Sequence, residues 1–329
     1  LSIRRQRQMC IRDRLWVASS DYRTDIRISS KILDQLVEIY RRIRNTARFI
    51  LGNLSDFNPR TDMVSYHNLD QLDCLILSNF QSLVKRVNES YNQFEFHSLY
   101  HEIHNFCAID LSSFYLDIIK DRLYTAFSDS LERRAAQTVL YQIINDLVKM
   151  IAPVLSFTAE EIWQYLREIE KGEESVFLTS WPEVNDNYRD KKLEQKWDNL
   201  LKIRKDVLKA LEIKRGEGFI GNSLEAQVNI YTTNKEIYDY LISFKGQLET
   251  IFIVSKTDIV HGKGDKELSF DAYAGVEFPD ITVLITRAPG KKCERCWCYS
   301  ETVGEDQKHP TICHRCAKVC LLYTSPSPR

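Results

Sequence analysis

Two closely spaced pairs of cysteines near the C-terminal end constrain the fold more than any other feature of the sequence. Residues 293–316 read CERCWCYSETVGEDQKHPTICHRC, with 16 residues between the two pairs. A spacing of two residues lets one tight turn present both sulfurs to a metal ion, and a second turn completes a tetrahedron. A separation of about 15–20 residues between the pairs is typical of zinc ribbons. We therefore predict one structural zinc ion, bound by Cys293, Cys296, Cys313 and Cys316.

The same cysteines allow two other interpretations, which are redox-active CxxC motifs and disulfides. Six of the nine cysteines fall in residues 293–329, and the start of the chain lacks the apolar core of a secretory signal. Both observations favour a metal site in a reducing cytoplasm. Cys298, His309 and His314 lie close enough in the sequence to compete as ligands. We interpret Cys298 as a bystander, because it breaks the geometry of paired turns.

Composition indicates an ordinary globular protein and excludes several classes of function. The chain has 329 residues, 43% of them hydrophobic, and a formal net charge of −1. This length suggests two or three domains, and without a run of 18 apolar residues no transmembrane helix is expected. None of the motifs GxxxxGK[ST], GxGxxG, GxSxG and HExxH occurs in the sequence. We therefore assign no catalytic residue.

Apolar residues recur at steps of three and four through the first half of the chain, which predicts helices. The expected helices cover residues 30–52, 69–91, 94–107, 112–124, 130–151 and 158–170. Ser29 or Ser30 can cap the first helix, and Thr158 with Glu161 forms a capping box for the last. Six helices with short connections predict a helical bundle over residues 15–172.

The sequence changes character after the bundle. Residues 173–190 are acidic and aperiodic, and we interpret them as an extended linker packed across the bundle. Residues 191–288 then predict a helix followed by a small mixed α/β domain. Its expected elements are a helix at 191–215, strands at 226–232, 250–255 and 281–287, and a helix at 234–244. The predicted fold is thus mainly α, and it ends in a four-cysteine zinc ribbon at residues 289–318.

A row of cations lies on one face of the first expected helix. Arg41, Arg44, Asn45 and Arg48 fall at i, i+3, i+4 and i+7, roughly opposite the apolar positions. Residues 41–60 contain five Arg and one Asp, a local excess that the balanced total conceals. Three guanidinium groups on a rigid helix suit a phosphate backbone, and Asn45 could bond a base edge. The alternative is a solvated face with salt bridges to carboxylates on adjacent helices.

A second group of cations surrounds the predicted zinc ligands. It includes Arg295 and Arg315, together with the aromatic side chain of Trp297. An aromatic side chain and several cations on a small zinc-fixed loop suit stacking on unpaired bases and contact with phosphates. The alternative is that Trp297 packs on the neighbouring domain.

A histidine cluster and the two chain ends receive no function. His97, His101 and His104 lie on one side of the third expected helix, where a metal or acid–base cluster could form, but we interpret them as structural. The stretches QMCIRDR and VCLLYTSPSPR resemble peptides translated from adapter sequence. Residues 1–14 and 319–329 are therefore expected to be artefactual or disordered.

Several segments together resemble bacterial isoleucyl-tRNA synthetases. They are LWVASSDY (15–22), YRRIRNTARFILGNL (40–54), HNFCAIDLSSFYLDIIKDRLY (104–124), IAPVLSFTAEEIW (151–163), WDNLLKIRKDVLKALEIKR (197–215) and the ribbon CERCW…CHRC. The likeness runs from Leu15 to Lys318. Valyl- and leucyl-tRNA synthetases are similar more loosely in the helical part, and the Trp after the first cysteine pair narrows the likeness to the isoleucine enzymes.

The resemblance implies the C-terminal part of such an enzyme, with an anticodon-binding bundle, a junction domain and a zinc ribbon. It implies tRNA(Ile) as partner, a monomer in the cytoplasm, and ATP-dependent aminoacylation by the intact enzyme. The HIGH and KMSKS signatures and an editing domain do not occur in this sequence. We therefore expect this chain alone to be inactive, with the ATP site in a missing N-terminal catalytic domain. The likeness strengthens the RNA interpretation of Arg41, Arg44, Asn45 and Arg48, and the zinc role of the four paired cysteines.

Other classes of protein remain open at this stage. A stand-alone zinc-ribbon nucleic-acid-binding protein is one, and the C-terminal part of a DNA glycosylase, whose ribbon has similar spacing, is another. A glycosylase would need a catalytic Pro or Glu beside the start of the chain, and the opening RRQRQ offers none. A helical adaptor with a structural zinc ion and no nucleic-acid partner is the third alternative.

Overall fold

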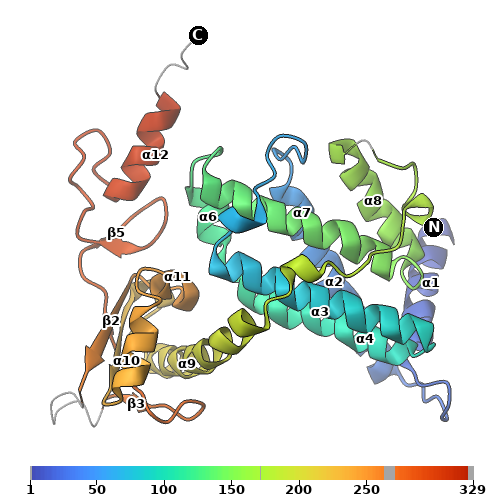
Figure 1. Cartoon of the computed structure of the whole chain (residues 1–329), viewed down its shortest axis with the longest axis horizontal. Helices are drawn as coiled ribbons and strands as arrows, with labels where there is room; N and C mark the ends of the chain where they lie inside the picture. Colours follow the sequence, from blue (N-terminus) through green and yellow to red (C-terminus); the bar gives the residue numbers. More distant parts are fainter. Residues whose placement is uncertain (1, 171, 263–270, 325–329) are drawn as a thin grey trace. The chain divides into compact units, whose positions relative to one another are not determined.

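The computed structural model describes residues 2–170, 172–262 and 271–324, coloured along the chain in Figure 1. The chain divides into two compact units, which are treated separately below. Unit 1 comprises residues 1–117 and 128–194, and unit 2 comprises residues 118–127 and 195–329. The fold is mainly helical, as predicted, with a small mixed sheet and a C-terminal cluster of cysteines. No helix in the described ranges combines the length and apolar character that crossing a membrane requires.

Unit 1 is a bundle of helices. Its main helices are α1 (Ser2–Ser19), α2 (Ser30–Asn53), α3 (Gln71–Asn92), α4 (Phe96–Asn105), α7 (Leu131–Ile151) and α8 (Ser156–Glu170). Short 3-10 turns lie at Tyr66–Asn68 (η1), Val176–Leu178 (η3) and Asp186–Tyr188 (η4). Helix α3 packs against both α4 and α7, and α7 packs against α8 (Figure 1). Helices α3 and α7 bury side chains on most of their faces, which is typical of helices at the centre of a bundle.

Helix α2 is amphipathic in the way the sequence predicts. Its buried residues are Leu36, Ile43, Thr46, Ala47 and Ile50. The helix begins after Ser29, whose side-chain oxygen accepts a hydrogen bond from the Ile32 N–H at 3.3 Å. This bond satisfies one of the free amides of the first turn, so the predicted cap at Ser29 is confirmed.

The predicted capping box at Thr158 is wrong. Helix α8 begins at Ser156, and the Ala159 N–H already bonds the Leu155 carbonyl at 2.8 Å. Thr158 is buried, and its hydroxyl lies 3.1 Å from the hydroxyl of Tyr40 on α2. The side chain therefore faces the neighbouring helix instead of the free amides of the first turn.

A wide helical turn replaces the break expected between residues 107 and 112. Helix α4 continues into a π-helix at Phe106–Tyr115 (η2) and then into α5 (Leu116–Ile118). The hydroxyls of Ser112 and Ser113 donate to the carbonyls of Cys107 and Ala108, each five residues earlier and at 2.8 Å. These two side-chain bonds have the same five-residue spacing as the backbone bonds of a π-helix, and they support the π-helix.

The segment after α8 packs across the bundle, as expected for the linker. Its backbone and side chains bond three side chains of α3: Ser78, Gln81 and Asn88. The Asp190 N–H donates to Ser78 Oγ at 2.9 Å, and the Asn185 N–H donates to Gln81 Oε1 at 2.8 Å. Residues up to Glu194 therefore belong to unit 1.

The expectation of disorder at both ends differs from the structure. Residues 2–14 lie in α1, and residues 319–324 lie in α12 (His314–Thr324); residues 1 and 325–329 are outside the described residues. Residues 2–14 are rich in the good helix formers Arg and Gln. In α1, Arg14 donates to the carbonyls of Pro153 and Val154, and Leu15 is buried.

Unit 2 contains a long helix, a four-stranded sheet and the cysteine-rich end. Its elements are α6 (Lys120–Thr125), α9 (Lys191–Gly216), η5 (Ser223–Glu225), β1 (Ala226–Thr232), α10 (Lys235–Ile242), α11 (Leu248–Phe252), β2 (Lys256–His261), β3 (Tyr273–Ala274), β4 (Thr282–Arg287), β5 (Lys291–Lys292), β6 (Tyr299–Ser300) and α12. The first residues of α9, up to Glu194, belong to unit 1. The strand order is β2-β1-β4-β3. Strand β1 runs parallel to β2, with Ile230 opposite Ile259, and antiparallel to β4, with Ile230 opposite Val283.

The strand predicted at residues 250–255 is wrong. Residues 248–252 form α11, which buries Leu248, Ile251 and Phe252 together. Ile253 then takes a left-handed backbone conformation, with φ 57°, and ends the helix. The strand β2 follows at Lys256–His261, directly after the predicted range. The run of β-branched residues indicated a strand, but their burial against the sheet decided for a helix.

A buried carboxylate fixes one loop beside this sheet. Asp206 on α9 is 1% exposed and accepts hydrogen bonds from the backbone N–H groups of Val276, Glu277 and Phe278. Gly275 starts the loop, and a Cβ there would lie 2.2 Å from the Phe278 carbonyl oxygen. Only glycine fits this close approach.

Candidate metal centre and nucleic-acid interface

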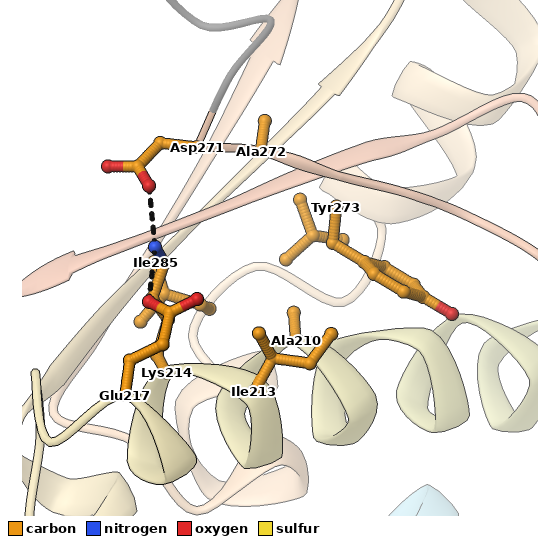
Figure 2. Close-up of a pocket in the computed structure, with 9 residues that line it drawn as sticks. Ala210, Ile213, Lys214, Glu217, Asp271, Ala272, Tyr273 and Ile285 are labelled. Carbon is orange, nitrogen blue, oxygen red and sulfur yellow. Dashed lines mark hydrogen bonds and ion pairs between the residues drawn. The ribbon is translucent and has the colours of Figure 1, made fainter.

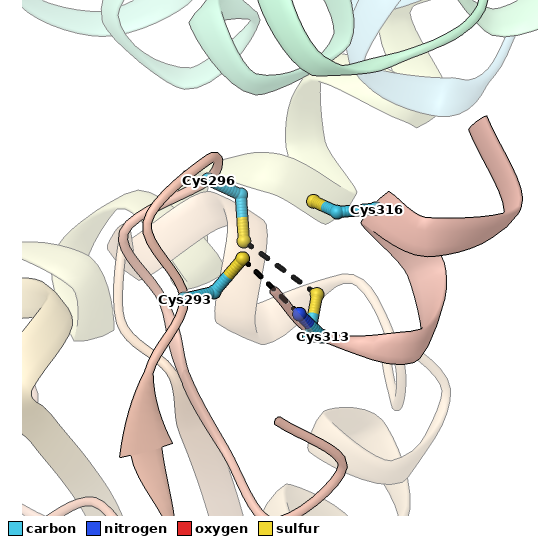
Figure 3. A group of neighbouring side chains, drawn as sticks. All are labelled: Cys293, Cys296, Cys313 and Cys316. Atoms are coloured by element: carbon cyan, nitrogen blue, oxygen red, sulfur yellow. Dashed lines mark hydrogen bonds between the residues drawn. The ribbon is translucent and has the colours of Figure 1, made fainter. Parts of the chain in front are cut away.

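The four paired cysteines converge on one point in unit 2. Cys293 and Cys296 lie on the turn after β5, and Cys313 and Cys316 lie at the start of α12 (Figure 3). All four sulfurs are within 4.8 Å of one another, and Cys293, Cys313 and Cys316 are buried. Cys296 Sγ and Cys313 Sγ are 3.8 Å apart. A tetrahedron with zinc–sulfur bonds of about 2.3 Å has edges of about 3.8 Å, so the spacing fits zinc.

The backbone of the first turn is shaped for this convergence. The Cys293 N–H bonds the Cys298 carbonyl at 2.9 Å, and the Trp297 N–H bonds the Cys293 carbonyl at 2.9 Å. Gly290 precedes β5 with φ 87°, and a Cβ there would lie 2.2 Å from the backbone of Ser300 on β6. Glycine is required at this crossing, because it permits the hairpin that brings the first cysteine pair to the second.

Burial and mutual hydrogen bonds shift the pKa values of the clustered thiols in opposite directions. Hydrogen bonds from the Cys298 and Cys316 thiols lower the pKa of Cys296, whereas burial raises the pKa of Cys313. The pKa of Cys316 is also raised, because its thiol bonds the Cys296 sulfur and is removed from water. One thiolate is therefore stabilised at the expense of its neighbours. Four thiolates become compatible only when a metal ion neutralises them.

Other candidate ligands stay outside the cluster. Among the described residues, the group that could hold a metal consists of the four paired cysteines alone. Cys298 Sγ lies 3.8 Å from the Cys296 carbonyl, and His314 Nδ1 lies 4.0 Å from Glu305 Oε2. The cysteines thus close the coordination sphere, which is the arrangement of a structural zinc site.

Trp297 lies on the surface of the ribbon. Its side chain is 59% exposed, and its backbone is left-handed with φ 65°. Lys292 Nζ lies 5.6 Å from the centre of its ring, within the range of a cation–π contact. The ring and its cation are therefore available to a ligand that carries a flat π-system and negative charge.

The two predicted arginines of the ribbon are engaged by unit 2 itself. Arg315 donates to both carboxylate oxygens of Asp121, at 2.5 and 2.8 Å. Arg295 Nη1 donates to the Thr125 carbonyl at 2.6 Å. Asp121 and Thr125 lie in α6, which precedes the ribbon by about 170 residues or more in the chain, so no local sequence pattern could have revealed these partners.

In unit 1 the cations of α2 form the exposed face that the sequence predicts. Arg41, Arg44, Asn45 and Arg48 are all exposed, while Ile43, Thr46 and Ala47 between them are buried. Arg41 pairs with Glu38 at 2.5 Å on the same helix, and Arg44 pairs with Glu161 on α8 at 3.6 Å. These pairs are exposed on both sides and contribute little to stability. In the part of the chain that the structure describes, Arg48 makes no ion pair.

A groove of about 410 Å³ lies between α2 and α8 beside these cations. Arg44 and Arg48 line one wall, and Thr158, Glu161 and Tyr165 line the other. Tyr165 is 56% exposed, so an aromatic face lies across the groove from two guanidinium groups. Tyr165 was not predicted from the sequence, although it lies four residues after Glu161 on the same face of α8.

Two other groups of polar side chains lie outside the sites described above. In unit 2 a hollow of about 140 Å³ lies beside α9, where Lys214 Nζ bonds Asp271 at 2.6 Å and Glu217 at 2.9 Å, so the cation is fully engaged by carboxylates (Figure 2). In unit 1, burial and the nearby Arg42 lower the pKa of His104, which favours the neutral imidazole. His97 Nδ1 and His104 Nε2 are buried without hydrogen-bond partners. The interpretation of this cluster as structural stays a prediction.

Comparison with known proteins identifies two families along the chain. Residues 73–230 match the family described as "Anticodon-binding domain of tRNA ligase". Residues 290–319 match the family described as "Zinc finger found in FPG and IleRS". The second match agrees with the predicted bounds of the ribbon, 289–318, and with the four-cysteine site.

Curated relatives cover most of this chain. The isoleucine–tRNA ligase of Caldanaerobacter subterraneus subsp. tengcongensis is 50% identical over 305 residues, which is 92% of this chain and 32% of that protein. The isoleucine–tRNA ligase of Desulforamulus reducens is 50% identical over 306 residues, and that of Moorella thermoacetica is 49% identical over 306 residues. These alignments cover 93% of this chain and 32% and 33% of the two relatives. The chain therefore spans about a third of the length of these relatives.

Proposed function

Because this chain belongs to the isoleucine–tRNA ligase family, with homology over 92% of its length, we propose that it is the part of such a ligase that binds the anticodon region of tRNA(Ile). The family match over residues 73–230 names an anticodon-binding domain, and a tRNA partner follows from that description. The identity of the tRNA is taken from the names of the relatives. The DNA glycosylase alternative loses its support, because the ribbon is shared by both classes whereas the anticodon-binding domain is not.

The observation that carries the proposal is the exposed row Arg41, Arg44, Asn45 and Arg48 on α2. The three guanidinium groups recur along about two turns of a rigid helix, and planar guanidinium groups suit phosphate oxygens. The carboxylates that pair with Arg41 and Arg44 are exposed, so a phosphate can replace them readily. Asn45 lies in the same row and supplies both a donor and an acceptor for a base edge.

The zinc ribbon supplies the second part of the proposed surface. Cys293, Cys296, Cys313 and Cys316 would hold zinc, which fixes the turn that displays Trp297 and has no reacting position of its own. Trp297 would stack on an unpaired base, as exposed aromatic side chains do in single-stranded RNA recognition. Arg295 and Arg315 stay in the proposed tRNA-contacting set, since a guanidinium has five N–H donors and α6 uses only part of them.

The remaining properties of the relatives are extended to this chain only as part of the proposal. In the intact ligase, ATP-dependent coupling of isoleucine to tRNA(Ile) would take place in the cytoplasm on a monomer. The 329 residues contain neither a HIGH nor a KMSKS signature. We therefore propose that this chain contributes tRNA binding and does not activate isoleucine by itself.

The experiment that tests the role of α2 is the double charge reversal Arg44→Glu with Arg48→Glu. It should weaken binding of tRNA(Ile) by about tenfold or more, since it removes two phosphate contacts and adds two repulsive charges. Thermal stability should change little, because both side chains are exposed. Binding is measured by fluorescence anisotropy of labelled tRNA, and stability by thermal unfolding.

A matched control is Lys191→Glu with Lys192→Glu, at the first turn of α9. Both lysines are exposed and lie in unit 1, and the change in net charge is the same. If this control weakens tRNA binding as much as the α2 variant does, the effect is one of net charge and the proposed surface is wrong. A large loss of stability in the α2 variant would instead support the alternative of a structural ion-pair network.

A further inference from the structure

Both cysteine pairs carry an arginine directly before their second cysteine, in the sequences CERC and CHRC. These residues, Arg295 and Arg315, reach the same short segment, residues 118–127, which contains α6. Arg315 bonds Asp121 in the first turn of α6, and Arg295 bonds the carbonyl of Thr125, the last residue of α6. The ribbon therefore holds α6 at both ends.

The two contacts differ in kind and support each other. The pair between Arg315 and Asp121 is bidentate, which fixes the orientation of both groups as well as their distance. Arg295 meets a carbonyl at the C-terminus of a helix, where free carbonyls and the helix dipole favour a cation. Within α6, the hydroxyl of Thr125 donates to the Asp121 carboxylate at 2.9 Å and so joins the two contact points.

Helix α6 has six residues and follows α5 after the single residue Ile119, and a helix of this length is not stable by itself in water. Its order depends on contacts with other parts of the chain, and the two arginines are among them. Since each arginine lies between two cysteines of a pair, its position depends on the fold of that cysteine turn. Arg295 Nη1 is also 3.7 Å from Cys316 Sγ, so this guanidinium contacts the sulfur cluster directly.

The cysteine turns have little else to hold them. The core of the ribbon consists of Cys293, Ile312, Cys313, Cys316 and Ala317, with Cys296, Val303 and Cys320 packed against it. A core of this size does not suffice without a crosslink or a metal. Binding of one metal by the four sulfurs would therefore set the positions of Arg295 and Arg315 as well.

We propose that Arg295 and Arg315 form a zinc-dependent latch on residues 118–127. With zinc bound, the two turns present both guanidinium groups to α6; without zinc, the turns lose their shape and α6 is released. Residues 118–127 belong to unit 2, although they lie between two segments of unit 1 in the chain. The proposal can be tested without tRNA, because the contacts it concerns lie within unit 2.

Hydrogen–deuterium exchange of the full chain tests the latch, with peptides that cover residues 118–127 as the readout. A suitable reporter is the amide of Leu123, which bonds the Ile119 carbonyl at 3.0 Å. Removal of zinc by a chelator should accelerate exchange in this segment by about tenfold. This factor corresponds to the loss of the bidentate pair between Arg315 and Asp121 and of the bond from Arg295 to the Thr125 carbonyl. Unchanged exchange after zinc removal would overturn the proposal.

Single variants distinguish the loss of the latch contacts from the loss of the metal. Arg315→Ala and, on the other partner, Asp121→Asn should each accelerate exchange in residues 118–127 by about threefold to tenfold while about one zinc per chain remains bound. Asp121→Asn leaves the ribbon sequence intact, so it stays informative even if Arg315→Ala impairs folding. The control is Lys292→Ala, which changes an exposed cation of the same ribbon and should leave the segment protected. If Asp121→Asn retains wild-type exchange with zinc bound, the latch does not exist.

Discussion

Trp297 occupies a backbone conformation that disfavours any residue other than glycine. With φ 65°, its Cβ crowds the following carbonyl, at a cost of about 1–2 kcal/mol. Non-glycine residues in such conformations tend to cluster at functional sites, where a particular side chain is needed. The side chain is 59% exposed, so burial does not explain its presence. This combination supports a role in contact with a ligand.

The substitution Trp297→Gly tests this role. Glycine accepts the left-handed conformation without strain, so zinc content and the thermal stability of the ribbon should be retained or slightly increased. Binding of tRNA(Ile) should weaken by on the order of 1–3 kcal/mol, the usual value for loss of a base–aromatic stack. Elemental analysis and anisotropy titration provide the two readouts. Wild-type affinity in a zinc-loaded variant would exclude Trp297 from the interface.

Asp110 gives unit 1 a distinct pH dependence. Burial raises the pKa of this carboxyl to about 6, although the nearby Arg86 acts in the opposite direction. An aspartate in the unfolded chain has a pKa of about 3.9, so the folded protein binds more protons between about pH 4 and 6. The stability that Asp110 contributes is therefore fully present below about pH 4 and is lost as the pH rises through about 6.

Asp110→Asn should remove this dependence, because the amide has no charge to bury. The free energy of unfolding at pH 7.5 should rise by on the order of 2 kcal/mol, and the gain should be smaller at pH 4.5. Urea unfolding at the two pH values measures the difference. An equal effect at both values would mean that ionisation of Asp110 is not the cause.

Individual site residues differ in how far the sequence could predict them. The four cysteines were predictable because their spacing alone brings the sulfurs of each turn together, and the exposed row on α2 was predictable because helical geometry fixes which residues share a face. The engagement of Arg295 and Arg315 was not, since Asp121 and Thr125 are distant in the chain and become neighbours only in the folded unit. Tyr165 was missed because the groove it lines exists only where two helices meet.

At the scale of elements, long amphipathic helices were predicted well and short elements were not. The bounds of α2, α7 and α9 differ from the expected ranges by one residue, because periodic burial and strong end signals specify them. The segment at residues 248–261 was misassigned, since a run of Ile, Phe and Val satisfies both a buried short helix and a strand. The π-helix at Phe106–Tyr115 was also missed, because its support comes from serine side chains that bond carbonyls five residues earlier.

The ribbon is the element whose stability depends most directly on a ligand. Removal of zinc by a chelator, or the substitution Cys313→Ser, should abolish the content of about one zinc per chain and unfold residues 293–318. The bundle of unit 1 has its own extensive core, so its helical circular dichroism should persist. Elemental analysis, exchange in the ribbon and circular dichroism distinguish these effects. Cooperative loss of the whole helical signal on chelation would contradict the independence of the two units.

Across the molecule as a whole, the near-zero net charge conceals two different surfaces, one in each unit. Unit 1 displays the exposed arginine row of α2, and unit 2 displays Trp297 on a ribbon fixed by four cysteines. The chain spans about a third of the length of its relatives, and residues 73–230 match an anticodon-binding domain of tRNA ligases. We therefore propose recognition of the anticodon region as the central activity of this chain.

The most direct test is the binding of labelled tRNA(Ile) by the zinc-loaded chain at increasing salt. The account predicts saturable binding whose logarithmic affinity falls linearly with the logarithm of salt concentration, with a slope of about −2 to −4 for a small number of phosphate contacts. A tRNA(Ile) that lacks its anticodon stem-loop should fail to compete. Undetectable binding, or equal competition by the tRNA without that stem-loop, would contradict the account.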